Sequence, residues 1–132
     1  MTIMKISTSS DLINLDHKTA KRIASLIPPS LFQIESNLFY KGQIPNLIFL
    51  LIRGEIKLLF KNNVELLVRP RQILGAKELL MLRPTSYDAI ALPGSQISMI
   101  DRSSFIDIVS QSNLRVFRHL EADIPEILVL KT

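Results

Sequence analysis

The hydrophobic residues of this chain follow three different patterns from one end to the other. In residues 16–27 they recur at helical spacing, Asp16 is suited to cap the helix, and Pro28 ends it. From about residue 30 to residue 101, short β-rich apolar runs alternate with turns. Helical spacing returns over residues 103–121. The pattern predicts a short N-terminal helix, a body of about eight antiparallel strands and a C-terminal amphipathic helix.

Two local signals place a turn and a helix start within this pattern. Asn62 and Asn63 separate the apolar runs 55–61 and 64–68. Asparagine tolerates the left-handed conformation that a tight hairpin needs, so we expect the two runs to pair antiparallel. Ser103 is suited to cap the last helix.

The order of helix, strands and helix is typical of a mainly β fold with flanking helices. It fits an eight-stranded antiparallel jelly roll or β-roll that is closed enough to hide its edge strands. The length of 132 residues and the apolar content of 47% suit one domain with one core, spanning residues 1–132. The tail 123–132 restarts after Pro125 with a short apolar run that is suited to dock on a partner or on the roll.

Composition narrows the expected compartment. The sequence has no cysteine, so we expect no disulfide, iron–sulfur cluster or thiol chemistry, and a reducing compartment is favoured. Residues 1–15 lack the apolar core of a secretory signal. The longest apolar run, residues 47–52, is far shorter than the roughly 20 residues that cross a bilayer. We therefore expect a cytoplasmic protein outside the membrane.

The net charge of +4 raises the question of nucleic-acid binding. The basic residues are scattered along the chain, apart from one local group formed by Arg69, Arg71, Lys77 and Arg83. The sequence has no tryptophan and two tyrosines, so basic and aromatic side chains do not interleave as in a single-strand binder. We interpret the basic residues as a solvated surface and expect no DNA-binding element.

The residue types and their spacing also disfavour catalysis. Small β-rolls host metal-dependent enzymes, but these need clustered imidazoles or carboxylates. The histidines, His17 and His119, stand at opposite ends of the chain. The sequence has no Ser–His–Asp arrangement, paired-carboxylate signature or phosphate-loop motif. We predict that the protein is not an enzyme and has neither a metal site nor a resident cofactor.

Four glycines mark boundaries between apolar runs: Gly42, Gly54, Gly75 and Gly94. With their neighbours they give the segments FYKGQIPNLIFLLIRGEIKLLF, ILGAKELL and ALPGSQISMIDRSSF. In this order and spacing the segments resemble the cyclic-nucleotide-binding domain family over residues 15–120. The resemblance implies the β-roll shared by catabolite-activator-type regulators, kinase regulatory subunits and gated channels.

The phosphate-binding cassette of that family reads Phe-Gly-Glu, two residues, Leu-Leu, and further on Pro-Arg-Ser/Thr-Ala. In the family, amides at the start of a short helix meet the cyclic phosphate, the Arg neutralises its charge and the Glu binds the ribose. The frame positions match here, at Leu74, Gly75, Leu79 and Leu80. Ala76 replaces the Glu, Thr85 replaces the Arg, and Tyr87 replaces a small residue. The resemblance implies a cassette that keeps its frame and lacks both charged ligands.

Two functions are compatible with such a cassette. The first is a non-enzymatic regulatory or interaction module that has lost ordinary cyclic-nucleotide binding and acts through a protein partner. Too few residues follow Phe105 for the family's winged helix-turn-helix. The resemblance also implies homodimerisation through the helix at 104–120, although the same apolar stripe is suited to pack on its own roll.

The alternative is a sensor that binds cyclic AMP, cyclic GMP or another nucleotide or anion through a non-standard cassette. Its candidate ligand-binding residues are Gly75, Ala76, Lys77, Glu78, Arg83, Thr85, Ser86 and Tyr87. The sensor needs a cation, for which Arg69, Arg71 and Arg83 are candidates. In the competing interpretation the arginines are solvated, residues 85–86 only lead into a strand, and Tyr87 fills the emptied pocket.

Overall fold

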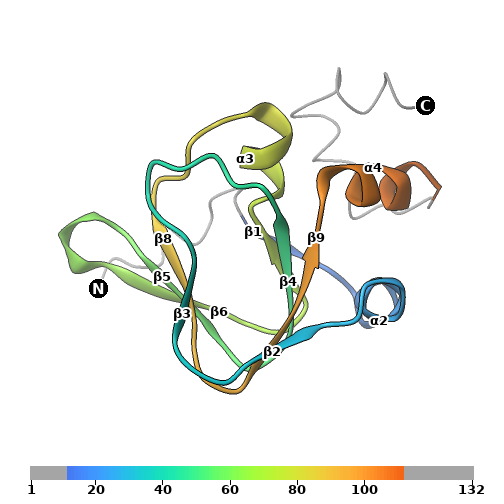
Figure 1. The fold of residues 1–132 in the computed structure, drawn as a ribbon, viewed down its shortest axis with the longest axis horizontal. Coiled ribbons are helices and arrows are strands. Elements are labelled where there is room, and N and C mark those ends of the chain that lie inside the picture. Colours follow the sequence, from blue (N-terminus) through green and yellow to red (C-terminus); the bar gives the residue numbers. More distant parts are fainter. Residues whose placement is uncertain (1–11, 112–132) are drawn as a thin grey trace.

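Two antiparallel sheets form most of the structure, a computed structural model that describes residues 12–111 (Figure 1). The strands are β1 (Leu12–Asn14), β2 (Ser30–Phe32), β3 (Ser36–Phe39), β4 (Ile48–Arg53), β5 (Ile56–Leu59), β6 (Glu65–Val68), β7 (Gln72–Leu74), β8 (Asp88–Ala91) and β9 (Ser95–Ile100). The large sheet has the order β1-β7-β4-β9-β2, and the small sheet has the order β3-β8-β5-β6. The described helices are α2 (His17–Leu26), α3 (Ala76–Met81) and α4 (Arg102–Gln111), with a 3-10 turn η1 (Lys61–Asn63).

The prediction of a mainly β roll is confirmed, and strands β2 to β9 supply the eight strands expected between residues 30 and 101. The sequence did not predict β1, which lies at the edge of the large sheet and pairs Leu12 with Leu74. Its three residues have no alternating pattern of their own. They form a strand because β7, far along the chain, offers them a partner.

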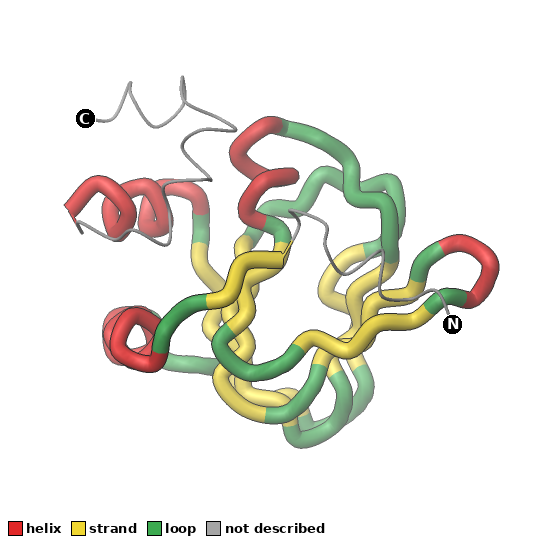
Figure 2. Tube along the Cα trace, turned by 180° about the vertical axis from the view of Figure 1, so that it is seen from behind, coloured by secondary structure: helices red, strands yellow, loops and turns green. Residues whose placement is uncertain are grey.

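The predicted hairpin is present as β5 and β6, with Ile56 opposite Val68 and Leu59 opposite Glu65. Asn62 has a φ of 62°, in the left-handed region that asparagine tolerates better than most residues. This hairpin projects at the opposite end of the molecule from α2 and α4, which lie on one flank (Figure 2).

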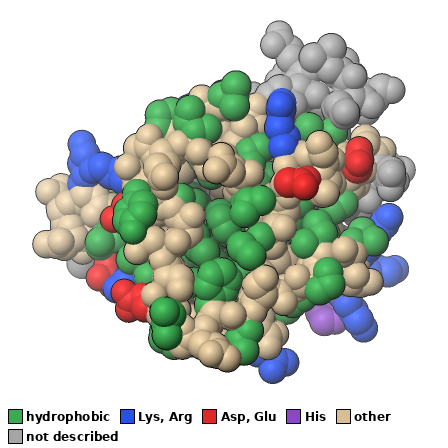
Figure 3. All heavy atoms as spheres, in the orientation of Figure 1, with side chains coloured by type: hydrophobic (Ala, Val, Ile, Leu, Met, Phe, Trp, Pro, Cys, Tyr) green, Lys and Arg blue, Asp and Glu red, His purple; other side chains and the backbone are tan. Residues whose placement is uncertain are grey.

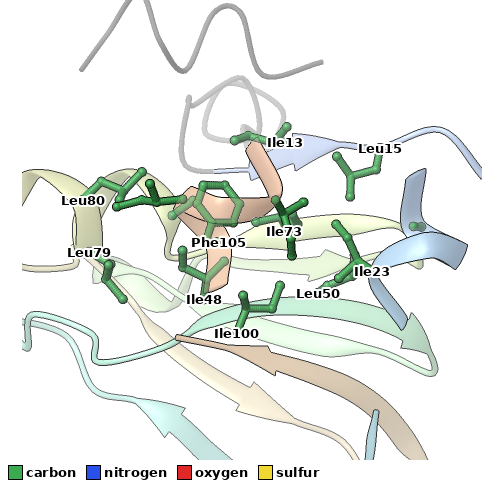
Figure 4. Packing of buried hydrophobic residues seen from close by; sticks show 14 residues of the cluster. Ile13, Leu15, Ile23, Ile48, Leu50, Ile73, Leu79, Leu80, Ile100 and Phe105 are labelled. Carbon is green, nitrogen blue, oxygen red and sulfur yellow. The ribbon is translucent and has the colours of Figure 1, made fainter. Parts of the chain in front are cut away.

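Strand β4 is buried on both faces, which explains why the longest apolar run of the sequence falls there. Ile48 and Leu50 point toward the helices, where they pack with Phe105 of α4 and residues of the other helices (Figure 4). The alternate residues Phe49 and Leu51 point between the two sheets. The protein therefore has two hydrophobic layers that share β4.

Helix α2 begins as the sequence predicts. The carboxylate of Asp16 accepts a hydrogen bond from the backbone N–H of Thr19 at 2.9 Å, which caps the first turn. At the other end, the hydroxyl of Ser98 on β9 donates to the carbonyl oxygen of Ile27 at 2.7 Å. Ile23 is fully buried against the large sheet. Both ends of α2 are thus held, one by its own cap and one by the sheet.

Helix α4 is capped by a different residue from the one expected. The carboxylate of Asp101 accepts a hydrogen bond from the backbone N–H of Ser104 at 2.7 Å, and the helix already includes Ser103. The prediction of Ser103 as the cap is wrong because the carboxylate two residues earlier reaches the first free amides. The remainder of the predicted helix 103–121 and the tail 123–132 lie outside the described residues.

Candidate functional site

The predicted cassette begins where β7 ends, at the junction with α3. Gly75 has a φ of 87°, and its carbonyl oxygen accepts a hydrogen bond from the backbone N–H of Leu79 at 3.0 Å. A Cβ atom at position 75 would lie 3.4 Å from the carbonyl oxygen of Leu47, so space alone would nearly admit one. The left-handed φ is the stronger reason for glycine here. It turns the chain so that Ala76, 1% exposed, enters the interior.

The end of α3 is a second left-handed turn, this time without glycine. Leu82 has a φ of 55° and leaves 67% of its side chain exposed. Its backbone N–H bonds the carbonyl oxygens of the last turn, and the N–H of Arg83 donates to the carbonyl oxygen of Glu78 at 2.8 Å. This pattern satisfies the last helical carbonyls. It also brings the Arg83 side chain to the surface.

Thr85, which the sequence resemblance aligns with the arginine of the family, is hydrogen-bonded to the loop after β3. Its backbone N–H donates to the carbonyl oxygen of Gln43 at 2.9 Å, and its own carbonyl oxygen accepts from the N–H of Gly42 at 2.9 Å. Its hydroxyl donates to the carbonyl oxygen of Tyr40 at 3.1 Å. All three polar groups of Thr85 therefore serve a contact between two loops, and the residue is only 4% exposed.

Tyr87 lies wholly inside the roll, with no exposed surface. Its ring centroid is 5.0 Å from that of Phe60 and 5.5 Å from that of Phe39, and Phe39 continues the group to Phe49 at 6.0 Å. Tilted rings at these distances attract one another in addition to burying apolar area. The interior between the sheets, next to Gly75, is therefore occupied by packed aromatic side chains.

The predicted ligand-binding residues fall into two groups. The polar residues of α3, Lys77 and Glu78, are buried with Ala76, at 7% and 3% exposure. Arg83 and Ser86 are exposed. Two further cation candidates are remote from the cassette, because Arg71 precedes β7, whereas Gly75 follows the other end of that strand, and Arg69 lies further back along the chain. The ligand-binding roles themselves stay predictions.

A small cavity lies beside the cassette, on the side of the loop after β3. Its volume is about 130 Å³, and it is lined by Leu38, Phe39, Gln43, Ile44, Pro45, Asn46, Leu47 and Phe49. The lining has no charged side chain, and pockets for drug-sized ligands usually enclose about 300–1,000 Å³. The glycine pattern of the sequence predicts a turn in this loop. It does not predict the cavity, because the lining residues come together only in the folded roll.

Other kinds of site are not visible in the described part of the chain. Within residues 12–111, no three His, Asp or Glu side chains come together in a way that could hold a metal ion. Among the helices of the same region, none is both long and apolar enough to cross a membrane.

The structure is an antiparallel β-roll with a short glycine-initiated helix between β7 and β8. The chain belongs to the cyclic nucleotide-binding domain family, whose sequence model matches residues 31–112. No curated protein matches the chain significantly.

Solved structures share the fold at low sequence identity. A structure from work on a cyclic-GMP-dependent signalling pathway that regulates bacterial phytopathogenesis has a TM-score of 0.72 and 19% identity, covering 88% of this chain and 96% of its own. The catabolite activator protein of Thermus thermophilus has a TM-score of 0.62 and 18% identity, covering 89% and 56%. PKAR CBD2 bound to Sp-2Cl-cAMPS has a TM-score of 0.62 and 19% identity, covering 86% and 77%. These likenesses establish the β-roll.

Proposed function

We propose that the protein is a cytoplasmic, non-enzymatic regulatory module that no longer binds ordinary cyclic nucleotides and acts through a protein partner. The observation that carries the proposal is the position of Tyr87, whose ring packs against Phe39 and Phe60 between the sheets. The resemblance places a small residue at this position in the family, so a tyrosine ring here adds side-chain volume to the interior. Here the ring contacts would have to break before a ligand could enter.

The chemistry of the cassette supports the same proposal. Ala76 and Thr85 offer neither the carboxylate nor the guanidinium that the family uses. Burying a phosphate without its guanidinium partner costs about 3–5 kcal/mol, and losing the ribose acceptor costs about 1–3 kcal/mol more. A micromolar ligand would become millimolar or weaker.

Exposed large apolar side chains on the two loops that carry Thr85 and its partners support a protein partner. Tyr40 and Ile44 flank the loop that Thr85 holds, and they are 57% and 46% exposed. Leu82 is 67% exposed at the end of α3. Apolar side chains at this level of exposure are common at protein interfaces when they occur close together. We also propose that α4 and the residues after it contribute to a homodimer.

Isothermal titration with cyclic AMP and cyclic GMP, carried to millimolar ligand, tests the proposal directly. We expect no saturable heat from either nucleotide. Saturation at micromolar ligand would contradict the proposal and favour the alternative, a sensor with a non-standard cassette. The exposed Arg83 is the side chain to substitute in that case, because it stands at the cassette edge as a full cation.

A further inference from the structure

A groove with an apolar floor and a basic rim lies between α2 and β4, on the flank away from the β5–β6 hairpin. Its volume is about 270 Å³, and it is lined by His17, Ala20, Lys21, Ala24, Ile52 and Arg71. A closed cavity of about 150 Å³ holds one benzene ring, so this groove has room for one or two aliphatic side chains. The rim residues are exposed, and the floor is buried or half-buried.

The basic character of the groove comes from two separate elements. Helix α2 carries four basic or imidazole side chains and no acidic one within its bounds, and Lys, Arg and His side chains gather over this helix in Figure 3. Arg71 adds a cation from the turn before β7. Its backbone is fixed, since its N–H donates to Leu51 and its carbonyl oxygen accepts from Leu15, both at 2.8 Å. Arg71 therefore stays at the groove edge in a left-handed conformation with a φ of 75°.

One segment of the same chain has the complementary chemistry. Residues 121–130 read EADIPEILVL, in which Glu121, Asp123 and Glu126 are acidic and no residue is basic. Apolar residues lie between and after the acidic ones, from Ile124 to Leu130. A groove with a basic rim and an apolar floor can bind such a segment in two ways. The acidic side chains pair with the cations of the rim, and the apolar side chains are buried on the floor.

The segment is also within reach of the groove. Phe105 of α4 and Ile23 of α2 belong to the same hydrophobic cluster, so the two helices occupy the same flank. Residues 112–121 follow α4 and span roughly 15 Å as helix and roughly 33 Å if extended. A domain of about 100 residues has a radius of gyration of about 13 Å, so either conformation reaches across one flank.

We propose that residues 121–130 dock into the groove formed by α2, β4 and Arg71 of their own chain. The acidic side chains lie against the cations Lys21 and Arg71, and the apolar side chains cover Ala20, Ala24 and Ile52. In the proposed arrangement, residues 121–130 occupy the groove of the free protein.

A spin label on the 132-residue chain tests this docking. Because the sequence has no cysteine, Thr132→Cys gives a single labelling site. With the nitroxide attached, we expect the methyl NMR signals of Ala20, Ala24 and Ile52 to lose most of their intensity, and to recover it when the nitroxide is reduced. The methyl signals of Leu67, exposed on β6 in the other sheet, should keep their intensity.

Charge reversal supplies the matched control. Lys21→Glu with Arg71→Glu should restore the groove signals, whereas Lys18→Glu with Arg22→Glu makes the same change on α2 outside the groove lining and should leave them attenuated. Equal recovery of the groove signals in the two double variants would overturn the proposal. So would a spin label that attenuates only signals outside the groove, or no signals at all. A mixture of spin-labelled chain and isotope-enriched chain without the label distinguishes docking within one chain from docking between two chains. Attenuation of the groove signals in this mixture would show that residues 121–130 of a second molecule occupy the groove, and it would overturn docking within one chain.

Discussion

The hydroxyl of Ser95 bonds to both backbone polar groups of Glu55: it accepts from the Glu55 N–H at 3.1 Å and donates to the Glu55 carbonyl oxygen at 2.8 Å. Ser95 opens β9 in the large sheet, and Glu55 stands where the chain passes from β4 to β5 in the small sheet. A buried hydroxyl thus joins the two sheets at the corner where the chain changes from one to the other.

This corner makes Gly54 sensitive to substitution. A Cβ atom there would lie 2.7 Å from the Cα atom of Ser95, on a backbone with a φ of 96°. We expect Gly54→Ala to lower the free energy of unfolding by about 3 kcal/mol, because about 1–2 kcal/mol of left-handed strain adds to about 1–3 kcal/mol of overpacking. Urea denaturation followed by circular dichroism measures the loss.

Gly94→Ala is the control, since its φ of 90° is similar but no atom lies within 4 Å of the added Cβ. It should cost only about 1–2 kcal/mol. Equal losses at the two positions would mean that the Ser95 contact contributes nothing beyond backbone strain.

The ring of Tyr87 should stabilise the roll strongly. We expect Tyr87→Ala to lower the free energy of unfolding by about 3–5 kcal/mol, the range for a fully buried aromatic side chain. Tyr87→Phe keeps the contacts with Phe39 and Phe60 and should cost at most about 1.5 kcal/mol, the net value of one hydrogen bond. Thermal melts of both variants check this, and a small loss with alanine would argue against tight packing of the ring.

Restoring the cassette requires space as well as charge. We expect Ala76→Glu with Thr85→Arg to give no measurable cyclic-nucleotide affinity, because Tyr87 still fills the interior. Adding Tyr87→Ala should free the space that the ligand needs, so that the introduced carboxylate and guanidinium can supply about 4–8 kcal/mol of binding interactions and bring the affinity into the range that titration can measure. The titration belongs at low temperature with a circular dichroism check of folding. Affinity in the double variant equal to that of the triple variant would show that Tyr87 is no obstacle.

Leu82 is a site where a substitution should stabilise the protein. Its left-handed φ of 55° strains a residue whose side chain is 67% exposed. Leu82→Gly should raise the free energy of unfolding by about 0.5–1 kcal/mol, since glycine is the preferred residue at the end of such a helix. Leu82→Ala keeps the strain and should give no gain in melting temperature, so a rise with alanine would point to the side chain and not the backbone.

The helix caps should make stability fall in acid. Hydrogen bonds from the side chain and the backbone N–H of Thr19 lower the pKa of Asp16 below 3.8, and bonds from the backbone N–H and the side chain of Ser104 lower the pKa of Asp101 likewise. The folded state therefore favours the charged carboxylates. Their stabilising contribution is complete above pH 3.8 and is lost as the pH falls through the lowered folded values.

Urea denaturation between pH 2 and pH 5 measures this loss. A variant with Asp16→Asn and Asp101→Asn keeps an oxygen acceptor at each cap but has no charge to titrate, so its stability should depend less on pH in this range. If the free energy of unfolding of this variant depends on pH as steeply as that of the original protein, other carboxylates cause the acid sensitivity.

Local chemistry decided which parts of the structure the sequence could predict. The Asn62–Asn63 turn and the Asp16 cap act within a few residues, and both were predicted correctly. Strand β1 depends on pairing with a distant strand, and the choice of Asp101 over Ser103 depends on the exact first residue of α4, so neither was available from local pattern.

The candidate site divides in the same way. Gly75 could be predicted from the sequence, because the turn from β7 into α3 is local and needs a residue that tolerates a positive φ. The triple attachment of Thr85 to the loop at residues 40–43 was not visible, because its partners are more than forty positions earlier in the chain. The same holds for the groove beside α2, whose lining comes from three separate segments.

The position of β9 has a consequence for synthesis on the ribosome. This strand, among the last to be translated in the described chain, lies in the interior of the large sheet between β4 and β2. Strand β2 pairs Ser30 with Ile97, and β9 is its one neighbour among the described strands, so β2 cannot pair until β9 has been translated. Sheets that rely on such distant pairings fold slowly and expose apolar surface meanwhile. The nascent chain therefore carries an unfinished large sheet until β9 has been translated, and the apolar surface that β9 covers stays exposed in that interval.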